Sequence, residues 1–102
     1  MNSLVGKRRG EVQALCRRYD VLRLDLFGSA AKGQDRFGES DLDFLVEFLP
    51  LAPGRYADAY FGCLESLQEL FGRSVDLVIA SSIKNPYFRE TVERTRSLVY
   101  AA

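Results

Sequence analysis

The sequence predicts an α/β (α+β) fold in which helices pack against a mixed β-sheet. Three short segments, 22–27, 41–48 and 74–80, alternate apolar and polar residues with a period of two, as strands with one face on a core do. Apolar residues recur at helical spacing over 56–71, and Gly72 follows as a helix-ending residue. The short connection between the first two strands permits antiparallel pairing, so we expect a mixed sheet.

The remaining segments complete the predicted order α-β-α-β-α-β-α. An amphipathic helix is expected at about 7–19. After the first strand, 29–32 is able to open a short helix, and 33–40 has the composition of a polar loop. Pro86 fits the first turn of a last helix. The chain closes at 98–100 as an extended segment or a final helical turn.

Length and composition indicate one small domain over residues 1–102, because 47% of its 102 residues are hydrophobic. No apolar run approaches the roughly eighteen residues of a membrane span, and no secretory signal is present, so we expect no membrane contact and a cytoplasmic location. The net charge is zero, which argues against direct nucleic-acid binding. Cys16 and Cys63 lie in apolar helical patterns and are expected to be buried thiols.

The sequence contains no histidine, which limits the chemistry available. Ser-His-Asp triads, Cys-His nucleophiles and His-ligated zinc sites are therefore excluded. Acid–base chemistry has to come from carboxylates, lysine, tyrosine or metal-bound water. Carboxylate ligands suit Mg²⁺ or Mn²⁺ better than softer metals.

Three aspartates are candidates for such a site. Asp41 and Asp43 are two residues apart on a predicted strand, so their side chains lie on one face, about 7 Å apart, and repel unless a cation lies between them. Asp76 interrupts an apolar strand, where a carboxylate is costly to bury unless it is paired or metal-bound. A solvated strand end is the alternative explanation for an isolated Asp-x-Asp.

Gly28 and Ser29 end the first predicted strand and are candidates for binding phosphate. Backbone N–H groups at a turn that opens a helix favour an anion, glycine lets phosphate approach the backbone, and the serine hydroxyl is able to donate a hydrogen bond. A Gly-Ser pair alone is a common turn, and the P-loop pattern is missing. The pair gains meaning from the aspartates that follow it.

The combination of this turn with the three aspartates resembles the signature of polymerase-β-like nucleotidyltransferases. The resemblance rests on Gly28-Ser-Ala-Ala-Lys-Gly33 and Ser40-Asp-Leu-Asp-Phe-Leu-Val46, and it extends to 75–78 and 98–100. The chain is most similar to the smallest members, the minimal nucleotidyltransferases (MNT) encoded beside HEPN-domain toxins. The resemblance implies the polymerase-β-like nucleotidyltransferase fold over essentially the whole chain.

The resemblance also implies a role for each candidate residue. Asp41 and Asp43 would bridge two Mg²⁺ ions, with Mn²⁺ as an alternative, and Asp76 would complete the metal site nearer the nucleophile and help to accept its proton. The triphosphate of ATP would lie against the turn. Many relatives carry Arg where this chain has Lys32, and lysine keeps the charge but gives up bidentate phosphate contact. The candidate nucleotide-binding residues are Gly28, Ser29 and Lys32.

The function implied by the resemblance is transfer of AMP from ATP to a protein hydroxyl, with release of pyrophosphate. The acceptor would be a tyrosine of a cognate HEPN toxin, which makes the chain the antitoxin of a type VII-like toxin–antitoxin pair. The alternative is a non-catalytic or weakly catalytic antitoxin that neutralises the toxin by binding, but such a protein has no need of three aspartates. Transfer to a small molecule such as an aminoglycoside is disfavoured, because no domain remains to hold it.

Overall fold

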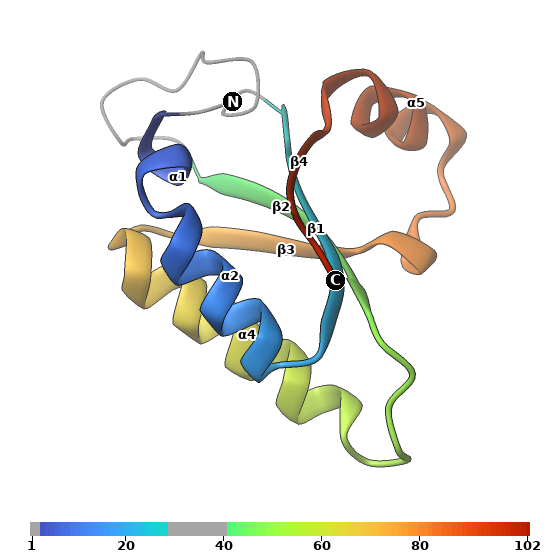
Figure 1. Ribbon diagram of the computed structural model, residues 1–102. Coiled ribbons are helices and arrows are strands. Elements are labelled where there is room, and N and C mark those ends of the chain that lie inside the picture. Colours follow the sequence, from blue (N-terminus) through green and yellow to red (C-terminus); the bar gives the residue numbers. More distant parts are fainter. Residues whose placement is uncertain (1–2, 29–40) are drawn as a thin grey trace.

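A mixed sheet with helices on both faces organises the chain, as Figure 1 shows. The structure is a computed structural model and describes residues 3–28 and 41–102. In chain order the elements are α1 (Ser3–Lys7), α2 (Arg9–Arg18), β1 (Val21–Phe27), β2 (Leu42–Phe48), α4 (Tyr56–Phe71), β3 (Val75–Ile79), the 3-10 helix η1 (Ala80–Ser82), α5 (Pro86–Thr95) and β4 (Ser97–Ala101). The predicted α/β (α+β) fold with a mixed sheet is confirmed.

The described strands lie in the order β3-β2-β1-β4. β1 pairs antiparallel with both β2 and β4, whereas β2 and β3 are parallel. Parallel pairing requires a crossover connection, and α4 supplies it between β2 and β3. The closing segment at 98–100, for which the sequence left two conformations open, is extended, because it belongs to the edge strand β4.

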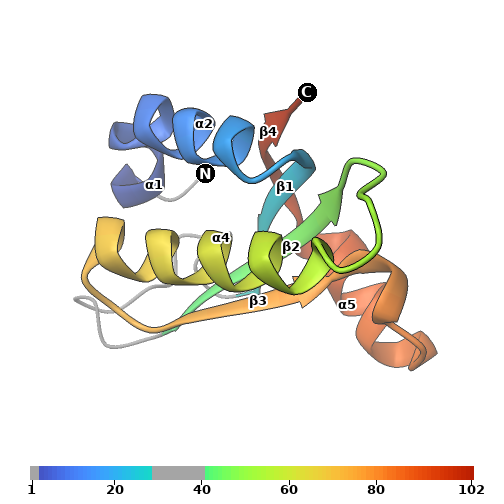
Figure 2. The ribbon, with the colours of Figure 1, turned by 90° about the horizontal axis from the view of Figure 1, so that it is seen from below.

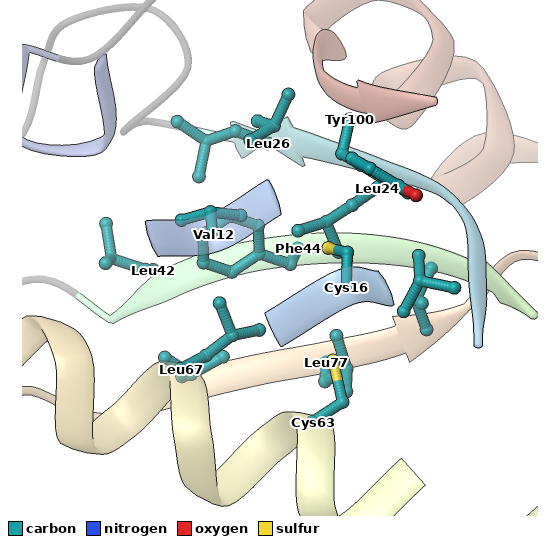
Figure 3. Close-up of a cluster of buried hydrophobic side chains, with 14 of the residues drawn as sticks. Val12, Cys16, Leu24, Leu26, Leu42, Phe44, Cys63, Leu67, Leu77 and Tyr100 are labelled. Atoms are coloured by element: carbon teal, nitrogen blue, oxygen red, sulfur yellow. The ribbon is translucent and has the colours of Figure 1, made fainter. Parts of the chain in front are cut away.

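The larger core lies between the sheet and the helices α2 and α4, which Figure 2 shows on the same side of the sheet. Alternate residues of β2, namely Leu42, Phe44 and Val46, are fully buried in it. This alternation confirms the face of β2 that the sequence assigns to the core. The side chains labelled in Figure 3 come from α2, α4 and all four strands: Val12, Cys16, Leu24, Leu26, Leu42, Phe44, Cys63, Leu67, Leu77 and Tyr100.

The two cysteines contribute to this core as small apolar side chains. Cys16 and Cys63 are free and buried, which confirms the prediction. Burial raises the pKa of each thiol to about 12, with a smaller contribution from Cys63 at Cys16. A thiol with so high a pKa is a poor nucleophile and a poor metal ligand at neutral pH.

A smaller core lies on the other face of the sheet, under α5. It consists of Phe27, Leu45, Ile83 and Val92. Asn85 caps α5, because its side-chain oxygen accepts hydrogen bonds from the first N–H groups of the helix, at 2.8 and 3.2 Å. The predicted start of this helix at proline is therefore confirmed.

Several element boundaries differ from the sequence prediction, among them those of β1 and β3, which were expected at 22–27 and 74–80. The helix expected at 7–19 is preceded by the separate helix α1, and the two helices are divided at Arg8, where φ is −104° and ψ is 14°. The strand expected from position 41 begins at Leu42. The segments expected at 29–32 and 33–40 lie outside the described residues. Within the described ranges, no helix has the length and apolar character needed to cross a membrane.

Candidate functional site

Two aspartates meet near the beginnings of β2 and β3. Asp43 and Asp76 are Cα partners in the parallel ladder, in which neighbouring strands lie about 4.8 Å apart. The residues on either side of each aspartate belong to the larger core, so both aspartates lie on the opposite face of the sheet. The packing of their apolar neighbours against α2 and α4 thus sets the direction of both carboxylates.

The ionised form of Asp43 is disfavoured by its surroundings. Burial, followed by the charges of Asp76 and then Asp41, raises the pKa of Asp43 to about 6. Asp43 is half-buried, whereas Asp76 and Asp41 are exposed. A divalent cation would remove this penalty, because it favours the ionised carboxylates, and carboxylate oxygens are the ligands that Mg²⁺ prefers.

The backbone of Gly28 packs closely against the carboxylate of Asp43. It follows Phe27, which pairs with Asp43 across β1 and β2. The φ of Gly28 is +74°, and a Cβ atom at this position would lie 2.7 Å from Oδ2 of Asp43. Only glycine combines this left-handed conformation with such a close approach. The backbone N–H of Gly28 donates a hydrogen bond of 3.0 Å to Oγ1 of Thr95, at the end of α5.

The other predicted site residues are placed less closely. Asp41 precedes β2 and affects Asp43 through its charge, so it is near the pair but not part of the ladder. Among residues 3–28 and 41–102, no three His, Cys, Asp or Glu side chains are gathered as a complete metal-binding group. Ser29 and Lys32 lie outside the described residues.

Asp76 is more exposed than the apolar run around it suggests. Its neighbours Val75 and Leu77 are buried, but the aspartate itself is exposed. The reason is that the smaller core on this face reaches β3 only further along the strand, at Val78, and then continues to Ala80 in η1. The carboxylate of Asp76 is therefore accessible to solvent.

A buried carboxylate that the sequence did not single out lies on the same face. Asp25 is 0% exposed and accepts hydrogen bonds from Nε of Arg23 at 2.8 Å and from Nε of Arg96 at 2.6 Å. Burial alone would raise the pKa of Asp25, but the two arginines outweigh it and hold this pKa below its ordinary value. The available signal was a charged residue within the leucine-rich strand β1. Asp25 is thus an ion-paired structural residue, distinct from the Asp43–Asp76 pair.

A hollow of about 570 Å³ lies away from the aspartates, at the far ends of β2 and β3. Its lining residues are Val46, Glu47, Phe48, Leu49, Pro50, Leu51, Tyr56, Ile79, Ala80, Ser81 and Arg89. Among the candidate site residues that the structure describes, namely Gly28, Asp41, Asp43 and Asp76, none lines this hollow. The chemistry of the chain is therefore assigned by the carboxylates and not by this hollow.

Paired carboxylates beside a glycine turn are typical of enzymes that transfer phosphoryl or nucleotidyl groups, in which such carboxylates hold divalent metal ions. Residues 11–99 match the family model described as nucleotidyltransferase domain. The chain belongs to this family and is a nucleotidyltransferase.

Known proteins extend this assignment. The chain is 36% identical over 83 residues to the Methanocaldococcus jannaschii protein named "Putative protein adenylyltransferase MJ1379", a match that covers 81% of this chain and 79% of that protein. A solved structure described as "putative minimal nucleotidyltransferase" is 35% identical, with a TM-score of 0.75 and 95% of each chain covered. The similarity to minimal nucleotidyltransferases that the sequence indicates is therefore confirmed.

The same fold occurs in a toxin–antitoxin complex. That complex is described as a tri-AMPylated Shewanella oneidensis HEPN toxin with its MNT antitoxin. The matching chain is 17% identical, with a TM-score of 0.64, and the match covers 96% of this chain and 73% of that chain. At this identity the likeness establishes the common fold.

Proposed function

We propose that this nucleotidyltransferase moves AMP from ATP to a hydroxyl group of a protein, with Mg²⁺ held by Asp41, Asp43 and Asp76. The observation that carries the proposal is the register of β2 and β3, which sets two carboxylates side by side on one face. The naming of a 36% identical relative as a protein adenylyltransferase supports both the nucleotide and the kind of acceptor.

The donor set suits the metal. Asp43 and Asp76 supply hard oxygen ligands. Burial, and then the charges of Asp76 and Asp41, raise the pKa of Asp43, and a divalent cation would favour its ionised form. Asp41, exposed just before β2, raises the pKa of Asp43 through its charge and would supply the third carboxylate. When bound, Mg²⁺ supplies neutralising charge for the phosphate oxygens.

The residues of the chain have separable tasks in this proposal. Gly28 leaves room beside Asp43 for the triphosphate, and Ser29 and Lys32 contribute a hydroxyl donor and a positive charge to it. The acceptor oxygen attacks the α-phosphorus of ATP and forms a phosphodiester, while the bond to pyrophosphate breaks. The carboxylate of Asp76, which is accessible to solvent, accepts the proton that the acceptor hydroxyl loses.

We infer that the acceptor is a tyrosine of a cognate HEPN toxin, so that the chain acts as an antitoxin. Support comes from the AMP groups on the toxin in the structurally similar complex, and from the minimal size shared with the 35% identical structure. An AMP group adds a negative phosphate to the toxin, and that charge repels an RNA backbone if it lies at the active surface.

The test is to incubate the chain with ATP, Mg²⁺ and the HEPN protein encoded beside it, then separate the two proteins. Mass spectrometry should find the partner heavier by one or more AMP units, and peptide mapping should find them on tyrosine. The partner should remain inactive after separation, because a phosphodiester persists where a bound protein does not. A partner that is unmodified and regains full activity would instead support an antitoxin that acts by binding alone.

A further inference from the structure

A hydroxyl group at the end of α5 holds the backbone of the turn beside Asp43. Oγ1 of Thr95 accepts a hydrogen bond of 3.0 Å from the N–H of Gly28, 67 residues away in the chain. The same hydroxyl donates to the carbonyl oxygen of Thr91 at 2.9 Å. With its proton directed at the helix, the oxygen keeps a lone pair for the glycine amide.

The contact is specific to Thr95 within its helix. Thr91, one turn earlier, makes the equivalent bond to the carbonyl oxygen of Tyr87 at 3.1 Å. Thr91 is exposed and lies on the same helix, whereas Thr95 is half-buried against Gly28. The two threonines thus differ chiefly in that Oγ1 of Thr95 also accepts the hydrogen bond from the Gly28 amide.

The end of α5 is also fixed independently of this contact. Arg96, the next residue, donates from Nε to the buried carboxylate of Asp25 at 2.6 Å. Two adjacent residues therefore attach α5 to β1 and to the glycine that follows it. Because this end of α5 is held to β1, the hydroxyl of Thr95 is a fixed acceptor for the backbone N–H of Gly28.

We infer that Thr95 is a positioning residue for nucleotide binding, which keeps the Gly28 amide and its left-handed turn in place against Asp43. The inference rests on the proposed function of Gly28 in binding the triphosphate. A glycine at φ +74° has many other conformations available, and a fixed N–H removes those that would swing the backbone away from Asp43. Nucleotide then binds to a turn that is already formed.

The experiment compares Thr95→Val with Thr95→Ser and Thr91→Val. Valine has the shape of threonine but no hydroxyl, serine restores the oxygen, and the Thr91 variant makes the same change one turn away. The amide of Gly28 is followed by hydrogen exchange in the free protein, and KM for MgATP and kcat are measured with the protein acceptor. Melting temperatures of all three variants report any general loss of stability.

Thr95→Val should speed exchange at Gly28 and raise KM for MgATP, each by roughly fivefold, as expected for the loss of one ordinary hydrogen bond. Changes in kcat should be smaller. Thr95→Ser and Thr91→Val should both behave like the wild type. If Thr95→Val fails to fold, Thr95→Ala takes the place of that variant in the experiment, because it removes the same hydroxyl oxygen.

Three results would overturn the inference. Unchanged Gly28 exchange in Thr95→Val would mean that the contact does not hold the turn. Faster exchange with an unchanged KM in an active enzyme would mean that the contact is structural only. A wild-type chain that transfers no nucleotide would overturn the proposed function as well, and that failure is recognised without any variant.

Discussion

Nε of Arg96 lies 2.6 Å from Oδ2 of Asp25, and this ion pair joins two residues that are 71 positions apart in the chain. Asp25 is fully buried in β1, and Arg96 immediately follows α5. Arg23 approaches the other carboxylate oxygen from the same strand at 2.8 Å. The two arginines differ in exposure, since the side chain of Arg96 is 19% exposed and that of Arg23 is 43% exposed.

This difference predicts unequal effects of removing the two charges. Arg96→Gln should lower the free energy of unfolding by about 2 kcal/mol, because it leaves a buried carboxylate short of its better-shielded partner. Arg23→Gln should cost about 0.5 kcal/mol, since solvent screens a pair of this exposure. Urea denaturation of the two variants measures both values. Equal losses would show that exposure does not govern the strength of these pairs.

The metal-free protein should become less stable as pH rises from about 4 to about 6. The pKa of Asp43 is raised from 3.8 to about 6, so in this window the folded state binds more protons than the unfolded state, and the free energy of unfolding falls with pH. Asp43→Asn should lack this contribution and should melt at a higher temperature than the wild type above pH 6. Thermal melts in EDTA across this range test the sign. A wild type that gains stability relative to Asp43→Asn over the same range would contradict it.

Mg²⁺ should stabilise the wild type but not Asp43→Asn. A ligand that binds only the folded state raises the melting temperature, and the asparagine variant removes one negative charge from the proposed donor set with little change in shape. The same variant should lose nucleotide transfer. Asp58→Asn, which alters an exposed aspartate in the first turn of α4, is the matched control and should respond to Mg²⁺ as the wild type does. A Mg²⁺ response retained by Asp43→Asn would remove this carboxylate from the metal site.

Gly28→Ala should be more damaging than Gly54→Ala. Both glycines have positive φ, +74° and +83°, so alanine at either position costs about 1 kcal/mol in backbone strain. At Gly54 nothing lies within 4 Å of the added Cβ, whereas at Gly28 the Cβ would be 2.7 Å from Oδ2 of Asp43. Gly28→Ala should therefore lower the free energy of unfolding more than Gly54→Ala does, and it should also reduce nucleotide transfer. Denaturation and transfer assays of both variants test how close the Gly28 turn lies to the carboxylate. Equal losses at the two positions would mean that the turn and Asp43 move apart freely.

The sequence predicts the fold well where periodicity is strong and unopposed. The apolar stripe of α4 and the alternation in β2 both appear as expected, because each buries one face against the same core. The sequence does not identify β4, since the three residues at 98–100 carry too little periodicity to separate a strand from a helical turn. Pairing with β1 settles it, and such pairing is a property of the whole sheet.

The sequence names members for the candidate site, and the family resemblance implies that the three aspartates share metal ions, but residue spacing alone does not give the strand pairing. The spacing of Asp41 and Asp43 fixes their common direction, yet the partnership of Asp43 with Asp76 depends on strand order and register, which no local pattern contains. The burial of Asp25 is equally absent from any local pattern. Its ion-pair partner Arg96 lies 71 positions away, and the leucine alternation of β1 indicates only that Asp25 faces away from the larger core.

Because of the parallel register between β2 and β3, Asp43 and Asp76 are adjacent only when the two strands are correctly paired. A register shift of β3 by one residue would turn Asp76 toward the core and expose Val75 and Leu77 on the opposite face. Burial of these apolar side chains under α4 therefore disfavours any register shift by an odd number of residues. The β1–β2 hairpin contains Asp43 but not Asp76. Asp76 lies beside Asp43 only when β3, which follows α4, pairs with β2. Affinity for the proposed metal should therefore appear only once β3 has docked beside β2, and a chain in which β3 is undocked should lack it.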